Sequence, residues 1–199
     1  GSLALGAATT ANLTVSSAFN VGTLDISAFA NTINIGANGA ISARNISLVA
    51  GTSFTAATGA ALTASNGGRW LVYSATPLSD NKGGMVYDFK EYNKSYPAGP
   101  TPSTGNGFLY SVAPTITPGL SGTAARPYNG LLAAPSGSLV VSGTGTIDGD
   151  SLLLTADSAS YASAHASASP IPVTANISLI NANNGLATVY GYQLSTSTA

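Results

Sequence analysis

The sequence predicts an all-β protein that begins with a right-handed parallel β-helix and continues into a small β-sandwich-like domain. Three observations lead to this prediction. Short segments of alternating apolar and small polar residues recur about every 20 residues in the first third of the chain. Gly, Ala, Asn and Ser separate these segments, as expected between strands. No segment carries the apolar stripe of an amphipathic helix, and even the Ala-rich stretch 156–168 lacks one.

Two series of short segments make up the repeat. The first series is NLTV at 12–15, TINI at 32–35 and SFTA at 53–56. The second series is TLDIS at 23–27 and NISLV at 45–49. Strands this short cannot bury their apolar side alone, so successive units must stack into a solenoid.

Stacking predicts both an interior and corners. We expect Leu24, Ile33 and Ile46 to line a common interior, coil upon coil. Four glycines between the strands fit corners that require a positive φ, namely Gly36, Gly39, Gly51 and Gly59.

Composition argues against several classes of function. Only 7% of the 199 residues are charged, against about 25% in an ordinary domain. The formal net charge of −1 gives no electrostatic basis for binding nucleic acid. No stretch approaches the roughly 18 apolar residues of a membrane-spanning helix, so we expect no membrane insertion. The chain has no cysteine for a disulfide or a cysteine-ligated zinc site, and we expect neither a cofactor nor a metal.

Charges and aromatic residues gather in an insert at about 69–112, within a first domain that we place at 1–118. Segments 69–74 and 107–112 both read as strands, which could pair with each other or continue the solenoid around a loop excursion. Aromatic rings beside charged groups suit a cap on the open end of the solenoid or a binding surface for a glycan or a host protein. The candidate ligand-binding residues are Trp70, Tyr87, Asp88, Lys90, Glu91, Tyr92 and Tyr96.

Residues 119–199 are predicted to form a separate small all-β domain. Turn residues at 148–150 (DGD) and 181–185 (NANNG) separate its strands. The strand candidates are 138–142, 151–155, 171–174, 177–179 and 190–194.

Few residues are arranged for catalysis. His165, the only histidine, lies in the stretch YASAHAS, and no serine has the flanking glycines of a nucleophile elbow. We interpret His165 as an exposed or hydrogen-bonded structural residue. The repeat carries a single carboxylate, Asp25, and therefore lacks the acid pair that cleaves glycosidic bonds. Asp148 and Asp150, with Asp157, could bind calcium, but a plain turn is favoured. We expect that the protein is not an enzyme.

The order of these features resembles a known family. GRWLVYS at 68–74, followed by a polar loop and FLY at 108–110, is similar to the segment that often closes the haemagglutinin-type β-helix of filamentous haemagglutinin-like exoproteins. Two-partner secretion exports these bacterial proteins, so the resemblance implies an outer-membrane transporter as a partner during secretion.

The C-terminal part resembles the small YDG/MBG-type repeat domains that often follow such β-helices. Its motif is RPYNG at 126–130, with Asn129 in place of the usual Asp. The later DGD turn and YGYQL at 190–194 follow in the order typical of that family. The change at Asn129 argues against any role that requires a charge at that position.

Together these features predict a structural and adhesive fragment of a secreted bacterial surface exoprotein. The solenoid would be the end of a rigid stalk, and the small domain a spacer. Expected partners are a glycan or a host or matrix surface protein, and the expected location is the cell surface or the medium. One alternative is a glycan- or host-protein-binding module that acts through the aromatic insert at 82–96. A polysaccharide-degrading β-helix enzyme is a third interpretation.

Overall fold

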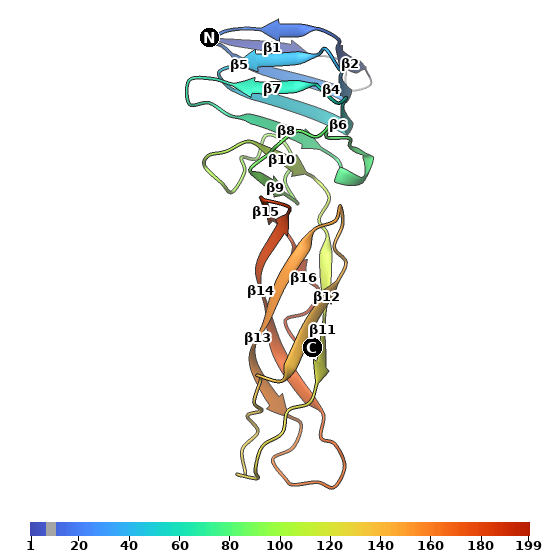
Figure 1. Cartoon of the computed structure of the whole chain (residues 1–199), viewed down its shortest axis with the longest axis vertical. Coiled ribbons are helices and arrows are strands. Elements are labelled where there is room, and N and C mark those ends of the chain that lie inside the picture. The colour runs from blue at the N-terminus through green and yellow to red at the C-terminus, as the bar shows by residue number, and fades with distance from the viewer. Residues whose placement is uncertain (7–10) are drawn as a thin grey trace. The chain divides into compact units, whose positions relative to one another are not determined.

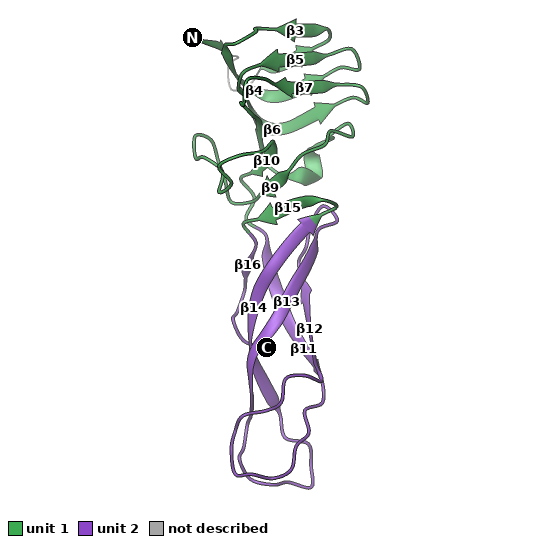
Figure 2. Cartoon of the chain, turned by 60° about the vertical axis from the view of Figure 1, so that its left-hand side comes forward, with its two compact units in different colours: residues 1–113, 184–191 green, residues 114–183, 192–199 purple. Residues whose placement is uncertain are grey.

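The computed structural model describes residues 1–6 and 11–199 and is all-β, with 51% of residues in strands and 2% in helix. Stacked parallel strands form a β-solenoid of about five turns, which confirms the predicted fold class. The chain divides into two compact units. Unit 1 contains residues 1–113 and 184–191, and unit 2 contains residues 114–183 and 192–199 (Figure 2).

Unit 1 is built from two parallel sheets, whose strands are labelled in Figure 1 except for β3, which Figure 2 labels. The larger sheet runs in the order β1 (Ser2–Gly6), β4 (Asp25–Ile35), β6 (Ile46–Ala56), β8 (Trp70–Ser74), β10 (Gly107–Tyr110), β9 (Phe89–Glu91) and β15 (Ala187–Tyr190), and β2 (Asn12–Val15) also pairs with β4. The smaller sheet contains β3 (Ala18–Asn20), β5 (Ala40–Ala43) and β7 (Ala61–Ala64). A short 3-10 helix, η1 (Pro77–Ser79), follows β8.

The register of the larger sheet follows the repeat of the sequence. Leu13 lies opposite Ile33, and Ile33 lies opposite Phe54, so the segments NLTV, TINI and SFTA occupy matching positions in three successive turns. Ile33, Ile46 and Phe54 are completely buried. Neighbouring turns thus hide one another's apolar side chains, and they satisfy one another's backbone hydrogen bonds.

One predicted interior residue is exposed instead. Leu24 is 39% exposed and lies in the turn before β4, whereas Ile26 takes the buried position opposite Ile46. The sequence comparison aligns Leu24 with Ile46, so the observed register of these two segments differs from the predicted one by two residues. Leu24 precedes Asp25, which pairs with a cation of the next turn, and this polar corner keeps the neighbouring side chain at the surface.

The corner glycines are needed for two different reasons. Of the four predicted corners, only Gly59 has a positive φ, at +94°. Gly39 is required by space, because a Cβ there would lie 2.2 Å from the carbonyl oxygen of Val15 in the preceding turn. The prediction of a positive φ was therefore wrong for Gly36, Gly39 and Gly51.

Gly39→Ala is expected to destabilise the solenoid by about 1–3 kcal/mol, since the added methyl must push two backbone segments apart. Thermal unfolding followed by circular dichroism would measure the loss. Gly36→Ala is the matched control, because its Cβ would lie 3.5 Å from the same oxygen, at ordinary contact distance. Equal melting temperatures for the two variants would contradict the close approach at Gly39.

Unit 2 contains two antiparallel strand pairs. β11 (Thr115–Gly122) pairs with β12 (Leu139–Thr144), and β13 (Ser151–Tyr161) pairs with β14 (Val173–Asn184). A short strand, β16 (Gln193–Leu194), runs parallel to the start of β11. Buried residues of β13 and β14 form a core with apolar side chains of β11 and β12, the sandwich-like arrangement that the alternating pattern predicts: Ala159, Ala175 and Ile177, with Leu120, Leu139 and Val141 among those packed against them.

The last strand of the solenoid comes from a distant part of the sequence. The sequence boundaries assign all of 119–199 to the second domain, but residues 184–191 belong to unit 1. There β15 runs parallel to β9, with Val189 opposite Lys90. A single four-residue strand carries no repeat that could reveal this pairing, which joins positions about 100 residues apart.

Candidate functional site

The insert adds strands to the solenoid out of chain order. β10 lies between β8 and β9 and is parallel to both, so the later segment fills the place beside the earlier one. Both sequence alternatives therefore hold: 70–74 and 107–110 pair with each other, and they continue the solenoid. Val72, Phe108 and Lys90 lie opposite one another along this part of the sheet.

An aromatic cluster fills the interior at these strands. Phe108 is completely buried at its centre, and its ring centroid lies 5.1 to 6.4 Å from those of four other rings. These rings belong to Phe54, Trp70, Tyr87 and Tyr110. The contacts with Phe54, Trp70 and Tyr87 are edge-to-face, the favourable arrangement for aromatic pairs.

The outer face of the same strands is also covered. Leu71, Tyr73, Phe89 and Leu109 form a second buried cluster, and alternation along the strands places it on the side opposite Phe108. The loop at 93–106 lies over this cluster. The Tyr73 hydroxyl donates to the carbonyl of Ala98 at 3.1 Å, and Arg69 Nη1 donates to that of Pro102 at 2.9 Å.

A buried carboxylate holds the loop in place. Glu91 is 2% exposed and accepts the Thr101 N–H at 2.7 Å and the Thr101 hydroxyl at 2.5 Å. Lys94 Nζ lies 3.4 Å from the same side chain. A buried charge is tolerated only when it is paired and hydrogen-bonded, so this arrangement satisfies Glu91 while it fixes the loop.

The seven predicted ligand-binding residues do not gather on one exposed surface. Trp70, Lys90, Glu91 and Tyr92 are buried, and Tyr87 is half-buried. Lys90 Nζ lies 5.3 Å from the centroid of the Tyr92 ring. These side chains contribute to the interior and to the anchoring of the loop.

Asp88 and Tyr96 are the two exposed members of the predicted set. Asp88 Oδ2 accepts the Asn106 N–H at 2.7 Å. Tyr96 is 42% exposed, and its ring makes edge-to-face contacts with Phe29 and Tyr73, at 5.1 and 5.4 Å. The insert thus adds β9 and β10 to the solenoid and covers their outer face, whereas the strand beyond β9 comes from 187–190.

An ion pair joins successive turns at one corner of the solenoid. Arg44 Nη2 lies 2.6 Å from Asp25 Oδ2, and Arg44 Nε donates to Asp25 Oδ1 at 2.8 Å. Asn45 donates its side-chain and backbone N–H to the same carboxylate. The Arg44 hydrogen bonds, with help from Asn45, hold the pKa of the Asp25 carboxyl well below its usual range.

The depressed pKa makes unit 1 sensitive to acid. The carboxyl of Asp25 ionises more readily in the folded than in the unfolded chain, so the pair stabilises the fold above the unfolded pKa of about 4 and is lost as the pH falls below it. Asp25→Asn should lower the melting temperature at pH 7 and remove part of its fall between about pH 5 and pH 2. Circular dichroism melts would show this, and parallel curves for both proteins would contradict it.

Burial acts in the opposite direction on a second carboxyl. Burial raises the pKa of Asp80, whose Oδ1 accepts the Phe54 N–H at 2.7 Å and the Ser74 hydroxyl at 2.8 Å. Protonation of Asp80 therefore favours the folded state as the pH falls. The difference in melting temperature between wild type and Asp25→Asn at each pH isolates the Asp25 contribution, because Asp80 is present in both proteins.

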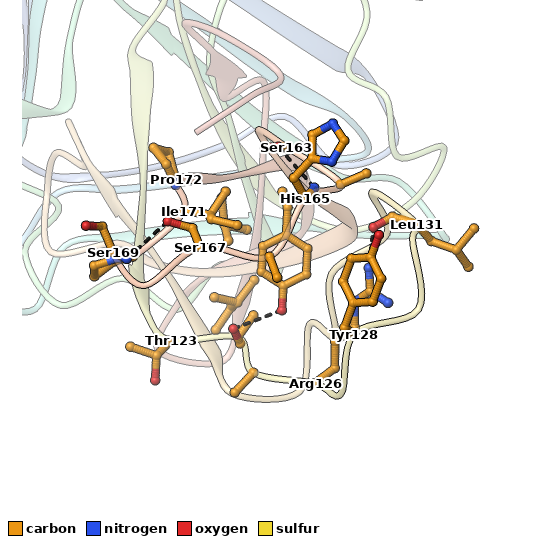
Figure 3. Close-up of a pocket in the computed structure, with 18 of the residues that line it drawn as sticks. Thr123, Arg126, Tyr128, Leu131, Ser163, His165, Ser167, Ser169, Ile171 and Pro172 are labelled. Atoms are coloured by element: carbon orange, nitrogen blue, oxygen red, sulfur yellow. Dashed lines mark hydrogen bonds between the residues drawn. The ribbon is translucent and has the colours of Figure 1, made fainter.

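Unit 2 contains a pocket of about 680 Å³ between the loops at 122–131 and 161–173 (Figure 3). Arg126 lines it and is the only arginine or lysine of unit 2. Sequence reasoning gave Arg126 and Tyr128 only as part of a motif, although a single cation in a segment of about 80 residues could have been a signal. His165 also lines the pocket; it is exposed, and its backbone N–H donates to Ser163 Oγ at 3.1 Å.

Two of the possible calcium ligands, Asp148 and Asp150, lie in a turn, whereas Asp157 lies within β13. Asp148 and Gly149 both have a positive φ, and the Asp150 N–H donates to the carbonyl of Ile147 at 3.2 Å. Asp150 Oδ2 accepts the Tyr192 hydroxyl at 2.9 Å. Among residues 1–6 and 11–199, no group of three or more His, Cys, Asp or Glu could hold a metal ion. Within those same ranges, no helix has the length and apolar character needed to cross a membrane.

No protein-family model, curated protein or solved structure matches this chain. The resemblance to haemagglutinin-like exoproteins and YDG/MBG-type domains stays a prediction from the sequence motifs.

Proposed function

We propose that this chain is a structural segment of a secreted bacterial surface exoprotein, with the solenoid as a stiff shaft and unit 2 as a spacer domain. One observation carries the proposal: a parallel ladder that continues from β1 through β15 around a closely packed interior. Each strand bonds to neighbours along the sheet, and burial of apolar area contributes about 25 cal/mol per Å². Such a ladder resists bending because deformation must break many of these contacts at once.

The charged groups of the solenoid support a structural role. Asp25 pairs with Arg44 of the next turn. Asp80 accepts hydrogen bonds from the Phe54 N–H and the Ser74 hydroxyl. Glu91 anchors the covering loop through Thr101. Each carboxylate therefore has a role in holding the fold together. We propose that the protein is not an enzyme, and that the outer-membrane transporter of two-partner secretion is its partner during export.

Exposure of the shaft on the producing cell tests this proposal. Antibodies raised against the purified chain are expected to label intact cells, and external protease is expected to remove the signal. A cytoplasmic protein of the same cells serves as the control and must stay protected. Labelling only after the cells are permeabilised would contradict a surface or secreted protein.

Adhesion through the insert is a second candidate function, supported by the exposure of the Tyr96 ring and of Asp88 within the insert. A glycan array, or binding to immobilised matrix proteins, would test it. Tyr96→Ala is the appropriate variant, because Tyr92 is 1% exposed and Tyr92→Ala would test folding instead. Binding that Tyr96→Ala leaves unchanged would argue against contact through this surface.

A further inference from the structure

The pocket of unit 2 has walls that are fixed by hydrogen bonds. The Tyr161 hydroxyl donates to the carbonyl of Ala124 at 2.9 Å, which ties the start of one loop to the other. Figure 3 shows Tyr128 and Leu131 on one side and Ser167 and Ser169 on the other. The volume of about 680 Å³ lies within the range typical of small-molecule sites, roughly 300 to 1,000 Å³.

Arg126 brings an unbalanced positive charge to this pocket. Its Nη2 donates to the carbonyl of Leu131, and its guanidinium lies 5.3 Å from the centroid of the Tyr161 ring. Its Nε and Nη1 atoms are buried and have no hydrogen-bond acceptor among the described residues. Buried donors without an acceptor are costly, and no Asp or Glu lines the pocket to balance the charge.

Hydroxyl and aromatic groups also line the pocket. The hydroxyl oxygens of Ser163 and Ser167 each accept a backbone N–H at 3.1 Å, and each hydroxyl can still donate its own hydrogen to a further acceptor. Tyr128 is 69% exposed at the mouth of the pocket and presents a flat apolar face. A ligand that suits these groups has an anionic group for Arg126, oxygen acceptors for the serine hydroxyls, and a ring that can pack on the face of Tyr128.

We propose that this pocket binds a carboxylate-bearing sugar, a hexuronate unit of an acidic glycan. A carboxylate has one negative charge, which one guanidinium neutralises, whereas a phosphate monoester has about 1.5 to 2 and would remain half-paired beside a single cation. The hydroxyls of the sugar match the serine hydroxyls, and its ring matches the face of Tyr128. The site lies within unit 2 and does not depend on the proposed role of the shaft.

Titration of the ¹⁵N-labelled full chain with sodium glucuronate, followed by NMR, tests the proposal. Saturable shift changes are expected in the amides of 122–131 and 161–173. Glucose, which lacks the carboxylate, and acetate, which lacks the ring, should each bind at least about tenfold more weakly. Tighter binding of inorganic phosphate than of glucuronate would overturn the assignment to a carboxylate, and no saturable change with glucuronate would overturn the site.

Two variants identify the contacts. Arg126→Gln should weaken glucuronate binding by about tenfold or more, whereas Arg44→Gln, the same substitution outside unit 2, should leave it unchanged. Tyr128→Ala changes an exposed side chain, so it keeps the test valid if Arg126→Gln fails to fold. We expect Tyr128→Ala to weaken glucuronate binding while it leaves acetate binding unchanged. Glucuronate affinity that neither folded variant alters would contradict the proposal.

Discussion

Ile33→Asp is expected to unfold the solenoid. Ile33 is completely buried, and the new carboxylate would lie between the apolar side chains of Leu13 and Phe54 in the neighbouring turns. The loss of apolar burial and the desolvation of a charge should together cost at least about 4 kcal/mol, a large share of the stability of a typical domain. Circular dichroism and size-exclusion chromatography would record the loss of β structure in unit 1.

Asn34→Asp is the matched control for this substitution. It introduces the same charge one position along the same strand, where the side chain is half-buried on the other face. We expect Asn34→Asp to fold and to melt close to wild type. A melting temperature for Ile33→Asp that equals that of Asn34→Asp would show that the interior has been assigned to the wrong face.

Phe108→Ala should destabilise unit 1 by about 3–5 kcal/mol and lower its melting temperature by about 12–20 °C. The ring is completely buried and contacts four other rings, so its removal leaves a cavity at the point where β8, β10 and β9 meet. Trp70 is the only tryptophan, and its ring lies 5.3 Å from that of Phe108. Its fluorescence therefore reports directly on this unfolding.

Phe108→Leu separates the cavity from the aromatic contacts. Leucine refills most of the space, so we expect it to cost less than half as much as alanine. Tyr96→Ala removes an aromatic ring from the exposed side of the insert and should have a smaller effect than either. A loss for Phe108→Ala no larger than that for Tyr96→Ala would mean that the insert is not part of the core.

The repeat could be predicted because it depends on local alternation. NLTV, TINI and SFTA each carry their apolar residues in the same order, and stacking converts that order directly into register. Leu24 was predicted to be buried because the segment 23–27 can be aligned with 45–49 in two ways, with either Leu24 or Ile26 opposite Ile46. Only the position of the turn before β4 distinguishes the two alignments. The prediction of a positive φ at the corners was wrong for a similar reason. Gly39 is needed because another turn approaches it closely, and not because of its own φ.

The burial of the insert and the pairing of the last strand could not be predicted from local sequence patterns. Trp70, Lys90 and Tyr92 have residue types that suit a ligand site, but the chain buries them because β10 enters between β8 and β9. That exchange of strand order, and the return of 187–190 to pair with β9, are long-range events. The pocket at Arg126 depends in the same way on two loops that the sequence separates.

Parallel stacking of successive turns is the central claim, and methyl NOE spectroscopy of the Ile-, Leu- and Val-labelled chain tests it most directly. Adjacent strands lie about 4.8 Å apart, so methyl groups opposite each other are within reach of an NOE. We predict contacts between Leu13 and Ile33, between Ile26 and Ile46, and between Leu48 and Val72. In parallel strands the residue numbers of the paired methyl groups increase together. NOEs in which the residue number rises along one strand and falls along its neighbour would indicate antiparallel pairing and contradict the solenoid.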